Sequence, residues 1–63
     1  MITMFRNSAT SQKVILFDET EENEKCPAVF LNADDDRFIT LIFFKDKSTA
    51  FNFLRSIDFI QIV

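Results

Sequence analysis

The chain contains no glycine in its 63 residues, and this absence limits both its turns and its chemistry. Glycine adopts positive φ without steric cost, so turns that need the left-handed region must here use Asn or Asp, which tolerate it best among the other residues. Phosphate-binding loops and dinucleotide fingerprints require glycine for a tight turn and for close approach of the backbone to the ligand. We therefore expect neither kind of nucleotide site, and no cofactor.

Catalytic side chains are also scarce. The absence of histidine excludes Ser-His-Asp and Cys-His arrangements and disfavours zinc, and the single cysteine cannot form an internal disulfide. That residue, Cys26, follows an acidic run, and nearby negative charge opposes thiolate formation, so we interpret it as a packing residue. A carboxylate pair for acid–base chemistry would need a cleft that so small a domain hardly forms. We expect no catalytic or metal-binding residue and a protein that is not an enzyme.

The length predicts one small domain, residues 1–63, of marginal stability. A chain of this size buries only about 60% of the surface that its unfolded form exposes. Small domains often compensate with disulfides, a structural metal or a partner, and the first two are disfavoured here. Hydrophobic residues make up 48% of the chain, which favours a folded domain. Association with another protein molecule is the remaining source of stability.

The sequence shows no sign of secretion or membrane insertion. The first residues lack a positive segment followed by an apolar stretch, and the longest apolar run is far shorter than the roughly 18 to 20 residues of a membrane helix. A single unpaired cysteine favours a reducing compartment. We expect a soluble protein of the cytoplasm with no membrane contact.

Acidic residues are concentrated in the middle of the chain. Segment 18–36 holds eight acidic residues and one basic residue, a net charge of −7, whereas the flanking segments carry +4 and the whole chain −3. An acidic segment repels the backbone of nucleic acids and attracts basic surfaces. Direct binding of DNA or RNA is therefore not expected, and a basic protein surface is the favoured partner.

The periodicity of apolar residues predicts an α+β domain with the order β-β-β-β-α-β, a small antiparallel sheet of four to five strands and one helix packed on one face. Asp46 or Ser48 is the predicted N-cap, Asp58 ends the helix, and the Asn/Asp-rich segment 32–36 forms a hairpin loop of about five residues. The predicted elements are strands at 1–5, 13–17, 28–31 and 37–44, a helix at about 47–57 and a last strand at 59–63.

The strand at 37–44 is apolar on both faces, which predicts a central position, and the strand at 13–17 has the same pattern. One helix can cover only one face of such a sheet. The other face would be a contiguous apolar patch, which is rare on a soluble monomer and marks an interface. We therefore expect homodimerisation through sheet surface or an edge strand, or docking on a larger protein.

Two groups of acidic residues are candidate contact sites. The first, Asp34, Asp35 and Asp36, is either a cation site, a contact for a basic partner or a solvated hairpin loop; its spacing lacks the glycine and the distant glutamate of a calcium loop. The second includes Glu21, Glu22 and Glu24, in a segment that could imitate the phosphates of nucleic acid or be a flexible charged loop.

Nine phenylalanines exceed what so small an interior comfortably buries. Some of them should therefore be anchors on the less covered face of the sheet, and Phe17 and Phe30 are the candidates. A stacking platform for single-stranded nucleic acid would also need a positive groove, and the connecting loops are acidic.

Together these features predict a small, non-catalytic protein–protein interaction module that self-associates and occupies a partner as an accessory inhibitor or modulator. The acidic segment would steer the encounter, so binding should weaken with salt. The residue usage is typical of an AT-rich coding sequence and favours a viral or mobile-element accessory protein in the host cytoplasm. The alternative is an acidic nucleic-acid mimic that blocks a DNA- or RNA-binding protein.

Overall fold

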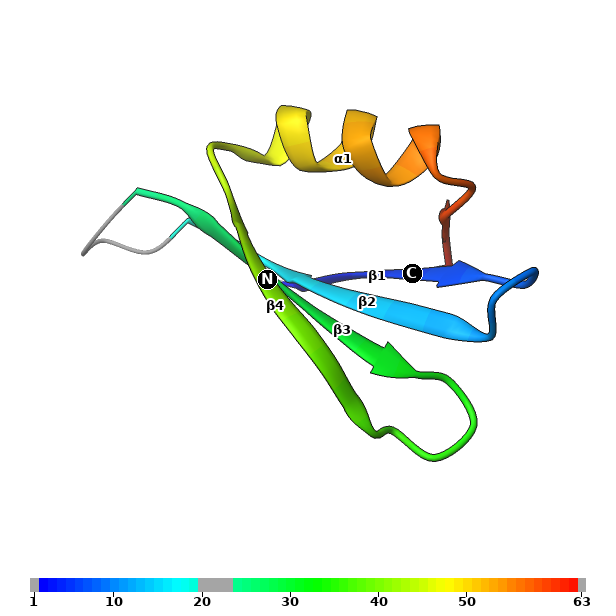
Figure 1. The fold of residues 1–63 in the computed structure, drawn as a ribbon. Coiled ribbons are helices and arrows are strands. Elements are labelled where there is room, and N and C mark those ends of the chain that lie inside the picture. The colour runs from blue at the N-terminus through cyan, green and yellow to red at the C-terminus, as the bar shows by residue number, and fades with distance from the viewer. Residues whose placement is uncertain (1, 20–23, 63) are drawn as a thin grey trace.

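In a computed structural model, which describes residues 2–19 and 24–62, four strands follow one another before the helix crosses the sheet to a fifth (Figure 1). The predicted α+β class and the order β-β-β-β-α-β are confirmed. The elements are β1 (Ile2–Asn7), β2 (Gln12–Phe17), β3 (Cys26–Asn32), β4 (Phe38–Phe44), α1 (Lys47–Ser56) and β5 (Ile60–Gln61).

The turns show how the chain folds without glycine. In the part of the chain that the structure describes, positive φ falls on four residues, with values of 55° to 69°. Two of them, Asp36 and Asp58, are of the residue type that the sequence predicts for this conformation, whereas Ser11 and Glu24 are not. In the loop between β3 and β4, the side-chain oxygen of Asn32 accepts from the backbone N–H of Asp34 (2.9 Å), which stabilises the turn locally.

The sheet has the order β4-β3-β2-β1-β5, with every neighbouring pair antiparallel. The prediction that the strand at 37–44 is central was wrong, because β4 lies at the edge. After β4 the chain enters α1, crosses the sheet and returns beside β1, so no later strand pairs with the outer side of β4. A β-bulge opposite Phe30 and Leu31 shifts the register of β4, and residues 38–41 are exposed.

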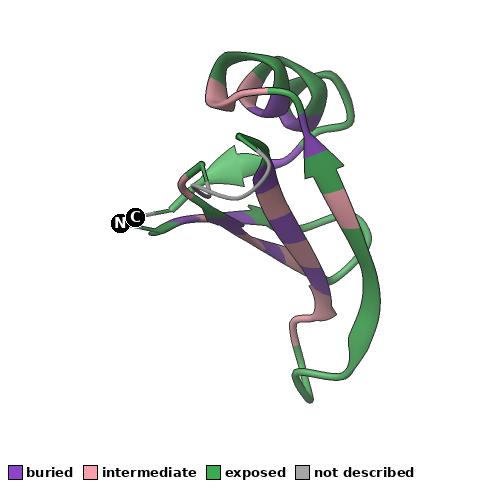
Figure 2. Ribbon diagram, turned by 90° about the vertical axis from the view of Figure 1, so that its left-hand side faces the viewer, coloured by how far each residue is buried: buried purple, intermediate pink, exposed green. Residues whose placement is uncertain are grey.

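The core lies between the sheet and α1. Alternate residues of the strands point toward the helix and are buried, a pattern visible along the strands in Figure 2. The helix contributes Ala50 and Leu54, both 0% exposed. Perpendicular ring contacts join Phe5 to Phe51 (5.2 Å between centroids) and Phe30 to Phe59 (5.9 Å). The buried apolar residues are Phe5, Val14, Leu16, Cys26, Ala28, Phe30, Phe44, Ala50, Leu54 and Phe59.

A side chain caps the N-terminus of α1, and backbone hydrogen bonds cap its C-terminus. Asp46, one of the two predicted candidates, is the N-cap, and its carboxylate accepts from the backbone N–H of Thr49 (2.7 Å). At the C-terminus, Asp58 and Phe59 donate to the carbonyls of Arg55 and Leu54, which is the Schellman arrangement with aspartate in the position that glycine usually takes. The buried Asn7 then ties β1 to this end, because its Nδ2 donates to the carbonyl of Ile57 (2.9 Å).

We expect acid to weaken the attachment of α1. The hydrogen bonds from Thr49 lower the pKa of Asp46, and the pKa of Asp18 is lowered chiefly by its pairing with Lys47. A carboxyl whose pKa is lower in the folded chain stabilises the fold above its unfolded pKa of about 3.9, and this contribution is lost as the pH falls through the lowered value. The urea midpoint should therefore fall between pH 5 and pH 3.

The double variant Asp18→Asn, Asp46→Asn is the control. Asparagine is also a good N-cap but does not titrate, so the fall in urea midpoint between the two pH values should be smaller than in the wild type. An equal fall in both proteins would show that other carboxyls govern the acid response.

Candidate interaction surface

The face of the sheet opposite α1 has no cover within the described residues (Figure 1). Because side chains alternate along each strand, the residues between the buried ones point to this side, and the strand registers place them beside one another. We call this surface the open face. Its residues are Ile2, Met4, Arg6, Lys13, Ile15, Phe17, Pro27, Val29, Leu31, Phe38, Leu41, Phe43, Ile60 and Ile62.

The open face is apolar except at one end. The middle row runs across the strands without a polar side chain, and its residues are Met4, Ile15, Val29 and Leu41. The row beside β1's N-terminus is also apolar: Ile2 pairs with Phe17, and Pro27 pairs with Phe43. The third row holds the two charged side chains of the open face, both positive, and Arg6 lies opposite Lys13. No acidic residue belongs to the open face.

Side chains of the open face are accessible in the single chain. Phe43 is 49% exposed and Ile60 67% exposed, although aromatic and branched aliphatic residues of these types usually lie inside. Scattered exposed hydrophobic residues are normal, but here they are contiguous across five strands. Within residues 2–19 and 24–62, the open face is therefore a continuous apolar surface that no other element of the chain covers.

The two predicted aromatic anchors lie on opposite faces. Phe17 is on the open face and 39% exposed, which agrees with its predicted position. The placement of Phe30 on the less covered face was wrong: it is 6% exposed and packs edge-on against Phe59 under the helix. The reason is register, because Phe30 pairs with Val14, a residue of the covered face.

Sequence reasoning missed most of the aliphatic members of the open face. The signal was present in the alternation of Ile2, Met4 and Arg6 in β1 and of Ile60 and Ile62 at the C-terminal end. The backbone N–H of Ile62 donates to the carbonyl of Met4 (2.9 Å), so this short segment extends the open face beyond β1.

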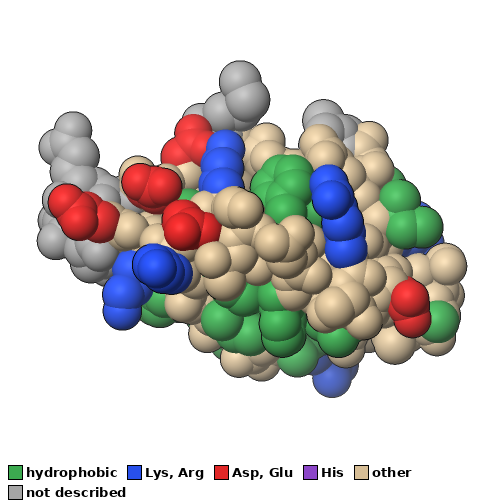
Figure 3. All heavy atoms as spheres, turned by 90° about the horizontal axis from the view of Figure 1, so that it is seen from above, with side chains coloured by type: hydrophobic (Ala, Val, Ile, Leu, Met, Phe, Trp, Pro, Cys, Tyr) green, Lys and Arg blue, Asp and Glu red, His purple; other side chains and the backbone are tan. Residues whose placement is uncertain are grey.

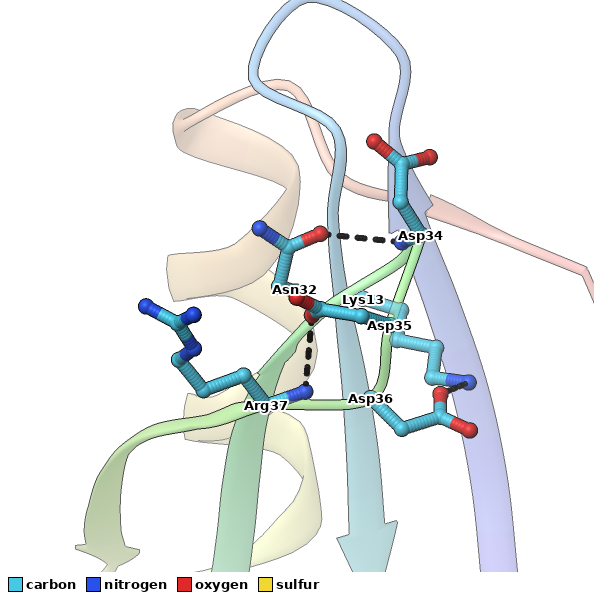
Figure 4. Close-up of polar contacts among 6 residues, drawn as sticks. All are labelled: Lys13, Asn32, Asp34, Asp35, Asp36 and Arg37. Carbon is cyan, nitrogen blue, oxygen red and sulfur yellow. Dashed lines mark hydrogen bonds and ion pairs between the residues drawn. The ribbon is translucent and has the colours of Figure 1, made fainter.

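The acidic triplet lies in the loop between β3 and β4, and two of its carboxylates have structural contacts there (Figure 4). Asp35 accepts from the backbone N–H of Arg37 (3.1 Å), and Asp36 forms an ion pair with Lys13 of β2. The side chain of Asp34 points away from both (Figure 4). The three carboxylates therefore do not converge, and the described residues contain no group of three or more acidic, Cys or His side chains placed to hold a metal ion.

The second acidic group is only partly described. Glu21 and Glu22 lie outside the described residues, whereas Glu24 is exposed and has a φ of 55°. Asp18 pairs with Lys47 at the start of α1, which links the end of β2 to the helix. Seen from the helix side, acidic and basic side chains are interspersed at this end of the molecule (Figure 3).

Two further features of the described residues are a buried thiol and a shallow depression on the helix. Cys26 is fully buried, and burial raises the pKa of its thiol, with Glu19 adding to the effect. An open depression lies along α1 and is lined by Lys47, Ser48, Phe51, Asn52 and Arg55. The guanidinium of Arg55 lies over the ring of Phe51 at 5.9 Å. In the described part of the chain, no helix has the length and apolar character needed to cross a membrane.

No protein-family model, curated protein or solved structure shows significant similarity to this chain.

Proposed function

We propose that the chain is a non-catalytic protein–protein interaction module whose open face is covered by another protein molecule. The observation that carries this proposal is the open face itself, in which all residues but Arg6 and Lys13 are apolar. Burying such a surface against a protein is favourable by roughly 25 cal/mol per Å² of apolar area, before the cost of association. Beyond such self-association or docking through the open face, the module acts as an accessory inhibitor or modulator by presenting its acidic segment to a basic partner protein.

The acidic segment 18–36 has a steering role in this proposal. Its net charge of −7 attracts a basic surface over several ångströms and suppresses contact with nucleic acid. The reducing cytoplasm suits a protein whose only thiol is buried and unpaired. The residue usage also suits an accessory protein encoded by an AT-rich genome, such as a viral one.

Nucleic-acid mimicry has less support. A mimic needs carboxylates that are spaced along a surface and available to a partner, whereas Asp35 contacts the backbone of Arg37 in its own loop and Asp36 pairs with Lys13 of β2. If mimicry were the activity, the triple variant Asp34→Asn, Asp35→Asn, Asp36→Asn would abolish it, while changes on the open face would leave it unaltered.

Photo-crosslinking from the open face tests the proposal. The photoreactive residue p-benzoylphenylalanine replaces either Phe17 or Phe43 in the full chain, expressed in cells. Both are partly exposed aromatic positions of the open face, at 39% and 49%. Irradiation should join the chain to a protein, either another copy or a different one, and the mass of the product tells which.

Phe53 provides the matched control. It is also phenylalanine and 42% exposed, but it lies on α1, on the other side of the sheet. We expect little crosslinking from position 53. Equal yields from positions 17, 43 and 53, or no protein adduct from either open-face position, would contradict the proposal.

A further inference from the structure

We infer that the molecule covering the open face is a second copy of this chain, packed sheet against sheet about a two-fold axis with the strands of the two copies running in opposite directions. This inference rests on the proposed function and names the partner.

The area of the open face matches what a symmetric dimer needs. Seven of its apolar side chains keep between 39% and 67% of their surface exposed: Ile2, Phe17, Phe38, Leu41, Phe43, Ile60 and Ile62. With the half-buried residues between them, they present on the order of 800 Å² of mostly apolar surface, which is about what each partner contributes to a stable interface of standard size. A second copy would therefore cover the whole open face and leave no large apolar area exposed.

The shape of the open face also suits a second copy. Sheets twist with a fixed hand, and two sheets of the same hand stack at about 10 Å with their strands roughly 30° apart. Another copy presents the same twist and the same apolar rows. A two-fold contact uses the identical surface on both molecules and therefore closes at the dimer.

The charges at the ends of the open face select the direction of the strands. Arg6 and Lys13 lie at one end, while β2 leads at the other end through Phe17 into Asp18 and Glu19. Lys13 already pairs with Asp36, and Asp18 with Lys47. Within residues 2–19 and 24–62, Arg6 and Glu19 form no ion pair of their own.

If the strands of the two copies run antiparallel, Arg6 and Glu19 each gain a partner of opposite charge. With the strands of the two copies antiparallel, the basic end of one open face lies over the end of the other that carries Glu19, so Arg6 of each copy approaches Glu19 of the other. With the strands parallel, the four cations Arg6 and Lys13 of both copies would instead lie together, and like charges at an interface are strongly unfavourable. The two-fold axis therefore runs across the strands.

A charge exchange between two variants tests this arrangement. In Arg6→Glu, residues 6 and 19 are both acidic, and in Glu19→Lys both are basic, so each variant by itself places like charges at both ends of the dimer. Either change alone should weaken self-association on the order of tenfold at low salt. Mixed in equal amounts, the two variants pair acid with base at both ends and should form a heterodimer about as tight as the wild-type dimer.

Sedimentation velocity over a range of concentrations gives the association constants, and circular dichroism checks that each variant retains the wild-type fold. Glu19 lies outside the strands, so Glu19→Lys tests the arrangement even where Arg6→Glu disturbs β1. A mixture that associates no better than the single variants would overturn the opposed arrangement. A wild-type chain that stays monomeric at high micromolar concentration would overturn the dimer, while crosslinks from position 17 to a different protein would still support the proposed function.

Discussion

Replacing Leu54 by alanine is expected to remove most of the stability of the isolated chain. Leu54 is fully buried at the centre of the helix–sheet contact, and cavities left by Leu→Ala changes cost about 2–5 kcal/mol. A domain of this length has a total of only about 3–9 kcal/mol. Urea unfolding followed by circular dichroism should show a midpoint far below that of the wild type, or no folded baseline at all.

Leu41→Ala is the matched control, because the same atoms are removed from a leucine that is 43% exposed on the open face. At a concentration where the chain is monomeric, this change should cost less than about 1 kcal/mol, since little buried surface is lost. If Leu41→Ala were as destabilising as Leu54→Ala in the monomer, the open face would already be covered within the chain.

Replacing Val29 by lysine should abolish self-association while leaving the single chain folded. Val29 lies in the middle row of the open face, between Ile15 and Leu41. In the monomer a lysine there can extend its charged end into water. In the dimer the charge would be buried near the two-fold axis, close to its own copy, without a partner. Such unpaired charges cost about 3–5 kcal/mol, more than a hundredfold in the association constant.

Asn52→Lys adds the same charge to the exposed side of α1 and should leave the association constant within about threefold of the wild-type value. Sedimentation equilibrium on both variants measures the difference. Loss of association in both would indicate a general effect of net charge, and association of Val29→Lys at the wild-type level would exclude the open face as the contact.

Local features of the fold were well predicted by the sequence. The N-cap, predicted at Asp46 or Ser48, is Asp46, and the helix ends before Asp58 as predicted; both features depend on a few neighbouring residues. The turn after β1 was predicted to begin too early, because Arg6 and Asn7 are polar. Asn7 is nevertheless buried, since its amide binds the carbonyl of Ile57, a contact between residues 50 positions apart.

The strand order could not be predicted because it depends on where the helix delivers the last strand. A strand apolar on both faces is typical of the centre of a sheet, yet β4 lies at the edge. The sequence placed Phe17 and Phe30 on the same face of the sheet for a related reason. In β2 both alternating sets, Val14 with Leu16 and Ile15 with Phe17, are apolar, so the pattern does not show which set faces the helix. Only the position of α1 decides which set is covered.

The acidic triplet shows the limit of reading sites from composition. Three consecutive aspartates could bind a cation or a basic partner, but consecutive loop residues point in different directions. Asp35 and Asp36 bind the backbone N–H of Arg37 and the ammonium of Lys13. The open face, which the sequence indicated only as an excess of apolar residues, becomes a defined surface once the strand registers align its rows.

Hydroxyl-radical footprinting of the wild-type chain tests most directly whether another molecule covers the open face. The labelling of Met4, Phe17 and Phe43 is compared between dilute and concentrated protein, with Phe53 of α1 as the internal reference. We predict that the three open-face residues are labelled several-fold less in the concentrated sample, while labelling of Phe53 stays constant. Equal labelling of the open-face residues at all concentrations, together with a sedimentation coefficient of a single chain, would contradict the account.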